Sequence, residues 1–120
     1  MGLSKPFPSG DGGWETSIFD QMVKNKLLTD NLFTFYLRRN QAQSKITFGG
    51  YEPSLIKGDI QWFPVIHDSY WMIPMNKIFL NDKDSGICNN DCAAIMDSGT
   101  SLITAPENDL YVLSRKFRSK

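Results

Sequence analysis

The sequence lacks the features of a membrane, fibrous or nucleic-acid-binding protein. Its 120 residues contain 13 Lys and Arg against 13 Asp and Glu, so the formal net charge is zero. Without an excess of positive charge there is no concentrated basic surface to bind phosphates, and we expect no nucleic-acid partner. No apolar run reaches the roughly eighteen residues that a membrane-spanning helix needs, so we expect no membrane partner. The hydrophobic and charged fractions, 41% and 22%, exclude a disordered tail, a coiled coil and a collagen-like chain.

The sequence also has little that suggests a leader or a metal site. Residues 1–13 are rich in Gly, Pro and Ser and contain no apolar stretch typical of a signal peptide, so a targeting signal would have to lie outside this sequence. A zinc site needs four ligands, and the single His67 with Asp91 would complete a poor set beside the two cysteines. We therefore predict no metal and no cofactor.

The two cysteines, Cys88 and Cys92, flank the sequence Asn-Asn-Asp. These residue types favour a tight turn because their side chains bond the nearby backbone and tolerate left-handed conformations. Such a turn can bring the two cysteines within bridging range. A local disulfide, which implies an oxidising compartment, is the preferred interpretation, and two free thiols in a reducing compartment are the alternative.

The periodicity of apolar residues predicts a mostly β chain with two short helices. One helix is expected over 17–28, capped by Thr16 or Ser17, and a second over 107–117, opened by Pro106. A turn is expected over 81–86, and the pair Gly49-Gly50 suggests a bend or the close approach of another backbone. Strands are expected over 32–38, 45–48, 59–66, 70–80 and 92–96.

One short segment concentrates the groups needed for chemistry. The apolar run 93–96 ends abruptly at Asp97, followed by Ser98, Gly99 and Thr100. The Gly99 amide and the Thr100 hydroxyl are placed to donate to the carboxylate, and Ser98 supplies a second hydroxyl nearby. Two donors would hold the carboxylate in plane and favour its charged form. The alternative is an Asx-turn that only closes a strand.

The segment is accompanied by further blocks, and together they make the chain resemble the pepsin-like aspartic proteases. The blocks follow the family's order along nearly the whole chain. They are Ser-Ile-Phe-Asp-Gln-Met from 17, Leu-Phe-Thr-Phe-Tyr-Leu from 32, Ile-Thr-Phe-Gly-Gly from 46, Gly-Asp-Ile-Gln-Trp-Phe-Pro-Val from 58, Tyr-Trp-Met-Ile from 70, the two cysteines, and Ala-Ile-Met-Asp-Ser-Gly-Thr-Ser-Leu-Ile from 94. In the family the paired cysteines form a disulfide.

The resemblance implies roles for individual residues. Asp97 corresponds to the second of two catalytic aspartates, with Thr100 hydrogen-bonded to its carboxylate. Ser98 corresponds to part of the hydroxyl network that braces the active-site loops. Three further residues resemble positions that line the substrate cleft, although ordinary core packing is the alternative for the first two: Tyr70, Ile95 and Ser101.

The family's mechanism needs two aspartates, and the resemblance supplies one. We therefore expect a partial pepsin-like fold, with residues 1–40 as the end of the N-terminal lobe and the crossover, and 41–120 as the first part of the C-terminal lobe. The expected function is part of an aspartic endopeptidase of the secretory, vacuolar, lysosomal or extracellular route, whose partners are a peptide or protein substrate and the missing remainder of both lobes.

Three alternatives stay open. The first is a catalytically inactive homologue that binds peptides or inhibits, since an extended cleft can bind a peptide as an added strand. The second is catalysis by a symmetric dimer, as in retroviral proteases. The third is an incomplete lobe that self-associates through exposed strand edges.

Overall fold

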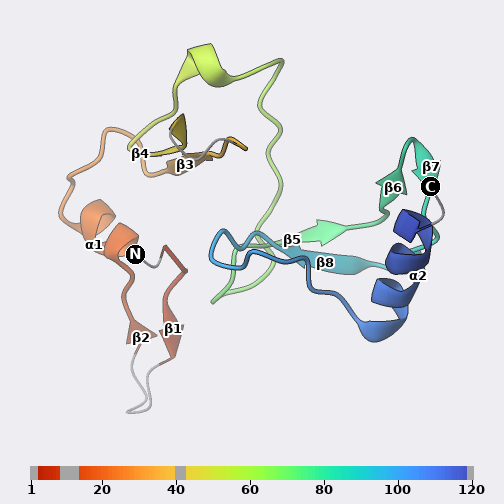
Figure 1. Ribbon diagram of the computed structural model, residues 1–120. Helices are drawn as coiled ribbons and strands as arrows, with labels where there is room; N and C mark the ends of the chain where they lie inside the picture. Colours follow the sequence, from red (N-terminus) through yellow and green to blue (C-terminus); the bar gives the residue numbers. More distant parts are fainter. Residues whose placement is uncertain (1–2, 9–13, 40–42, 119–120) are drawn as a thin grey trace. The chain divides into compact units, whose positions relative to one another are not determined.

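The computed structural model describes residues 3–8, 14–39 and 43–118, in two units that comprise residues 1–62 and 63–120 (Figure 1). Within these described ranges, the strand pairs are all antiparallel and form four two-stranded sheets. The elements of the first unit are β1 (Phe7–Pro8), β2 (Trp14–Glu15), α1 (Ile18–Lys24), β3 (Phe33–Tyr36), β4 (Lys45–Phe48) and the 3-10 turn η2 (Pro53–Leu55). Those of the second are β5 (Met72–Met75), β6 (Phe79–Leu80), β7 (Lys83–Asp84), β8 (Cys92–Ile95) and α2 (Glu107–Arg118). The predicted mostly β class with two helices is confirmed.

Helix α1 begins at a capping box. The Ser17 hydroxyl accepts from the Asp20 amide at 3.2 Å, and the Asp20 carboxylate accepts from the Ser17 amide at 3.2 Å. These bonds satisfy backbone donors that a helix start leaves unpaired. The prediction of a helix to residue 28 is too long, because the helix ends at Lys24 and the chain turns at Lys26, whose φ is +55°.

Strands β3 and β4 form a hairpin around an aromatic cluster. The ring of Phe33 packs edge-on against Phe19 of α1, with centroids 4.8 Å apart, and lies 5.9 Å from Phe35 and 6.4 Å from Phe48. Phe19 is buried and Phe35 is 38% exposed, so the cluster forms a small and partly covered apolar centre in the first unit. The expected lobe boundary between residues 40 and 41 falls between the two strands of this hairpin, and residues 40–42 lie outside the described part.

Gly49 follows this hairpin and allows the close backbone approach that the glycine pair suggested. Its φ is +77°, and its amide donates to the Leu32 carbonyl at 2.9 Å. A β-carbon on Gly49 would lie 3.1 Å from the backbone nitrogen of Thr29, whereas one on Gly50 would meet nothing within 4 Å. Gly49 is therefore required here both for its dihedral angle and for space.

In the second unit, β5 and β8 pair around a nested hairpin of β6 and β7 (Figure 1). Asn81 and Asp82 link β6 to β7 with φ of +50° and +59°, as a two-residue type I′ turn requires. The predicted turn over 81–86 is thus shorter than expected, because Lys83–Asp84 forms β7. Ser85, Ile87 and Cys88, which follow β7, are the buried residues of this unit within the described part of the chain.

Two strand predictions are wrong in detail. Residues 59–66 form no strand. Pro64 cannot donate to a ladder, and the Ile66 amide, at the end of the segment, donates to the Met72 carbonyl at 2.9 Å. The predicted strand 70–80 is interrupted and becomes β5 and β6. The second helix matches its prediction, with Pro106 immediately before the first helical residue and its carbonyl accepting from the Leu110 amide.

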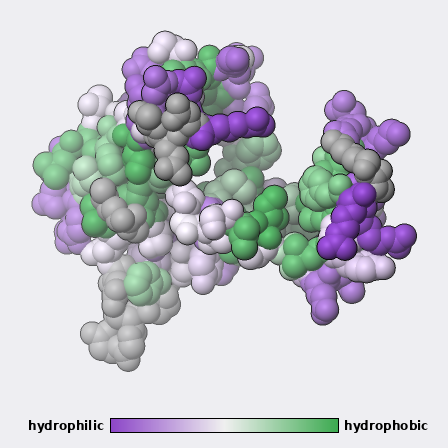
Figure 2. Space-filling model, in the orientation of Figure 1, coloured by the Kyte–Doolittle hydropathy of each residue, from purple (hydrophilic) through white to green (hydrophobic). Residues whose placement is uncertain are grey.

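Much apolar surface remains exposed in both units (Figure 2). Among the described residues, the exposed fractions are 77% for Trp62, 78% for Leu102 and 80% for Ile103. Compact domains more often bury apolar side chains of this kind.

Candidate active site

The pairing of β5 with β8 positions the acidic turn. Met72 lies opposite Ile95, the last residue of β8, and the Met96 amide donates to the Trp71 carbonyl at 2.9 Å, which extends the ladder by one residue. Asp97 follows directly, so its backbone is anchored by the preceding bond while its side chain is exposed to solvent.

Two neutral donors hold the Asp97 carboxylate. The Gly99 amide donates to Oδ1 at 2.8 Å, and the Thr100 hydroxyl donates to Oδ2 at 2.5 Å. Both bonds favour the charged form, and the pKa of Asp97 is therefore lowered, first by Thr100 and then by Gly99. A β-carbon on Gly99 would lie 3.1 Å from Oδ1, so any larger residue there would press on the carboxylate. The chain thus has both hydrogen bonds expected from the sequence.

The Asp-Ser-Gly order also occurs at Asp84, which the sequence analysis did not single out. The Gly86 amide donates to Asp84 Oδ1 at 2.8 Å, the same turn geometry as at Asp97. The other oxygen of Asp84 accepts from Lys77 Nζ at 2.6 Å, and this ion pair is the main cause of the lowered pKa of Asp84. The fourth position is Ile87, which is buried and supplies no hydroxyl. The charge of Asp84 is therefore balanced by a lysine, whereas both donors to Asp97 are neutral.

A disulfide closes the turn that precedes β8. Cys88 and Cys92 are bonded, with their Cα atoms 5.5 Å apart, and the predicted disulfide is confirmed. The turn contains left-handed residues at Cys88, with φ of +62°, and Asp91, with φ of +36°. Cys92 is the first residue of β8 and pairs with Met75, so the disulfide ties the start of the strand that leads to Asp97.

Comparison with known proteins identifies the family. The model of the eukaryotic aspartyl protease family matches residues 1–120. The chain belongs to the eukaryotic aspartyl protease family. It is 41% identical to embryonic pepsinogen of Gallus gallus over 92% of this chain and 28% of that protein. It is 38% identical to gastricsin of Macaca fuscata fuscata over 94% of this chain and 30% of that protein. It is 39% identical to cathepsin E of Cavia porcellus over 92% of this chain and 29% of that protein. The chain spans about three tenths of the length of these curated relatives.

The remaining predicted site residues of this aspartyl protease family member lie near the acidic turn. Ile95 ends β8. Tyr70 is 53% and Ile95 47% exposed, so neither is packed in a core in this structure. Ser98 is also exposed. Their roles in substrate binding and loop bracing remain predictions.

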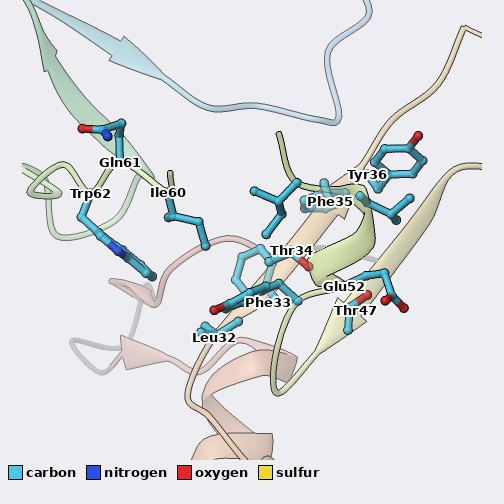
Figure 3. Close-up of a pocket in the computed structure, with 13 residues that line it drawn as sticks. Leu32, Phe33, Thr34, Phe35, Tyr36, Thr47, Glu52, Ile60, Gln61 and Trp62 are labelled. Carbon is cyan, nitrogen blue, oxygen red and sulfur yellow. The ribbon is translucent and has the colours of Figure 1, made fainter. Parts of the chain in front are cut away.

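Sequence reasoning missed an apolar pocket of about 340 Å³ in the first unit of this aspartyl protease family member (Figure 3). One side is built by β3 and the residue before it, and Ile60 and Trp62 reach toward Leu32 and Phe33 from the segment after η2 (Figure 3). The alternating aromatic residues of β3 are the part of this pocket that the sequence could indicate. The residues opposite β3 come from a segment without periodic structure, so no sequence pattern marks them.

Among the described residues, no three or more His, Cys, Asp or Glu side chains are grouped so that they could hold a metal ion. No helix in the part of the chain that the structure describes has the length and apolarity to cross a membrane.

Proposed function

We propose that this chain is part of an aspartic endopeptidase and that Asp97 is one of its two catalytic carboxylates. The observation that carries the proposal is the binding of the Asp97 carboxylate by Gly99 and Thr100, two neutral donors that orient it and keep it charged without a cation to offset that charge. A second carboxylate, from a part of the protein beyond this chain, completes the pair.

The chemistry follows from two carboxylates that share one proton and one water. The charged carboxylate takes a proton from the water, whose oxygen attacks the carbonyl carbon of the peptide bond, while the protonated carboxylic acid gives its proton to the carbonyl oxygen. The carboxyl group that took the water proton then gives it to the amide nitrogen, the C–N bond breaks, and a hydroxyl proton of the tetrahedral adduct returns to the other carboxylate. Two carboxylates held this close do not both ionise, and this coupling, for which aspartic proteases are the standard example, places activity at acidic pH.

The same proposal assigns the chain to two incomplete lobes, with residues 1–40 from the end of the first and 41–120 from the start of the second. It is supported by the coverage of about three tenths of each relative and by the exposed apolar surface. The remainder of both lobes is the partner that would cover this surface.

The disulfide supports a location in the secretory pathway, a vacuole, a lysosome or the extracellular space, because disulfides persist in oxidising compartments.

The test is cleavage of a denatured protein between pH 3.5 and 7 by the complete protein that contains this chain. We expect Asp97→Asn to lower the rate by at least about a hundred-fold, the lower range for removal of a general acid or base. Asp84→Asn is the matched control, since it alters an Asp-Ser-Gly turn of the same geometry, and it should leave the rate within a few fold. Full activity of the Asp97→Asn protein would refute the proposal.

Two other outcomes would select the alternatives. Binding of extended peptides by the complete protein without cleavage would indicate an inactive, peptide-binding homologue. Acid-dependent cleavage by the 120-residue chain alone, lost in Asp97→Asn, would indicate that two copies each supply one Asp97.

A further inference from the structure

We propose that His67 is a pH-dependent positioning residue, which holds Tyr70 beside Asp97 when its imidazole is neutral and releases it on protonation. The relevance to catalysis rests on the proposed function, since it takes Tyr70 as part of the peptide-binding surface. The switch itself is a property of the turn over residues 67–70 and can be tested without any cleavage assay.

The first observation is the hydrogen bond that closes the turn. The Ser69 amide donates to His67 Nδ1 at 3.1 Å, from two residues further along the chain. This is the pattern of an Asx-turn, in which the oxygen of Asn or Asp accepts from the backbone two residues on. His67 here takes the place that Asn commonly occupies, with Nδ1 as the acceptor and the proton of the neutral ring on Nε2.

The second observation is that the same imidazole touches Tyr70. The ring centroids of His67 and Tyr70 are 5.0 Å apart with an interplanar angle of 50°. His67 therefore fixes the turn through its Nδ1 atom and contacts the Tyr70 ring through its face or edge. A change in the position of the imidazole must change the surroundings of Tyr70.

The third observation places this turn next to the acidic turn. The Ile66 amide donates to the Met72 carbonyl at 2.9 Å, so the chain before His67 returns alongside the start of β5. The Met96 amide donates to the Trp71 carbonyl at 2.9 Å. Tyr70 immediately precedes Trp71, and Asp97 immediately follows Met96. One backbone hydrogen bond thus separates the two turns.

The switch follows from the electron pair on Nδ1. A proton taken up from solvent binds the same lone pair that accepts the Ser69 amide, and a doubly protonated imidazolium has only donors. Protonation and the turn hydrogen bond are therefore mutually exclusive. Acidification that protonates the imidazole therefore breaks the bond and frees the turn.

Other titratable groups surround the turn and set the window of the test. Asp68 lies between His67 and Ser69, Tyr70 lies on the turn, and Asp97 lies across the Met96–Trp71 bond. Because these groups also ionise, the His67→Asn variant, which removes the imidazole, identifies the group responsible for a transition.

The test is amide hydrogen exchange and NMR of the complete protein that contains this chain between pH 5 and 8, with exchange expressed as a protection factor so that the pH dependence of the chemistry cancels. In the wild-type chain we expect the Ser69 protection factor to fall by about two- to ten-fold on acidification, the factor expected for one exposed hydrogen bond. The fall should coincide with the titration of the His67 ring signals and with a shift of the Tyr70 ring signals.

Two variants separate the switch from other causes. His67→Asn keeps an Asx-type acceptor that does not titrate, so Ser69 should stay protected at every pH in the window. His67→Ala removes the acceptor, so Ser69 should be unprotected throughout. Asp97→Asn should keep the wild-type transition, which distinguishes a failure of the switch from a failure of the proposed catalytic role. A Ser69 amide that is unprotected at pH 8 in the wild type, a protection factor that does not follow the His67 titration, or the same transition in His67→Asn would each overturn the proposal.

Discussion

The disulfide between Cys88 and Cys92 should control how firmly β8 holds the acidic turn. The two cysteines are four residues apart in the sequence, so the disulfide closes a short loop. The loop-closure relation gives about 2 kcal/mol of stabilisation for a loop of this size at 25 °C. This free energy acts on the start of β8, because Cys92 is its first residue and pairs with Met75 of β5. Reduction of the bond should therefore raise the population of the state in which β5 and β8 have separated.

The reporter for this separation is the Met96 amide, whose hydrogen bond to the Trp71 carbonyl is the last rung before Asp97. A change of about 2 kcal/mol corresponds to a roughly thirty-fold fall in its protection against hydrogen exchange, since 1.4 kcal/mol is a factor of ten. We expect that fall when the chain is treated with a dithiol, and also in the double variant Cys88→Ala, Cys92→Ala without reductant.

The double variant provides its own control, because the dithiol should have no further effect on it. If reduction of the wild-type chain changes the protection of Met96 by less than about three-fold, the turn is held by its hydrogen bonds rather than by the disulfide. The reasoning from loop closure would then be wrong.

Two further predictions concern single positions. Thr100→Val should raise the pKa of Asp97, because it removes the donor that lowers it most, while Thr100→Ser should keep it low; NMR titration of the side-chain carboxyl measures both. The pKa of Asp97 is depressed in the folded chain, so the stability that the Thr100 bond adds is present above the unfolded-state pKa and is lost as the pH falls through the folded-state pKa. An unchanged carboxyl titration in Thr100→Val would contradict the assignment of Thr100 as the main donor. Gly49→Ala should lower the free energy of unfolding by about 1–2 kcal/mol, measured by urea denaturation. The reasons are the positive φ at position 49 and the Thr29 backbone nitrogen that the new β-carbon would approach. Gly50→Ala, with open space around the position, should cost little, and equal effects of the two alanines would refute the explanation.

The features that could be predicted from the sequence are those set by local signals. Helix α2 is marked by Pro106 and by Glu107 in its first turn, and β4 matches its predicted bounds. The bonds to Asp97 come from residues two and three positions away, so the turn motif alone predicts them. The left-handed residue Asp91 likewise follows from the turn preference of Asn-Asn-Asp.

The features that could not be predicted depend on partners distant in the sequence. Residues 59–66 have a strand-like composition, but a strand needs a neighbour to accept its hydrogen bonds, and composition does not say whether one is present. Trp62 and Phe33 line one pocket from segments distant in the sequence, which no local pattern indicates (Figure 3).

The nesting of β6 and β7 between β5 and β8 has a consequence for synthesis on the ribosome. The β6–β7 hairpin has both strands available as soon as it leaves the exit tunnel, since a two-residue turn joins them. Strand β5 must wait for β8, which begins roughly 17 residues later, on the order of 1 to 3 s at usual elongation rates. During that interval the hydrogen-bonding edge of β5 is unpaired, and Cys88 emerges before the cysteine that it bonds. An enzyme that oxidises or a chaperone that shields nascent chains would act on this segment within that interval.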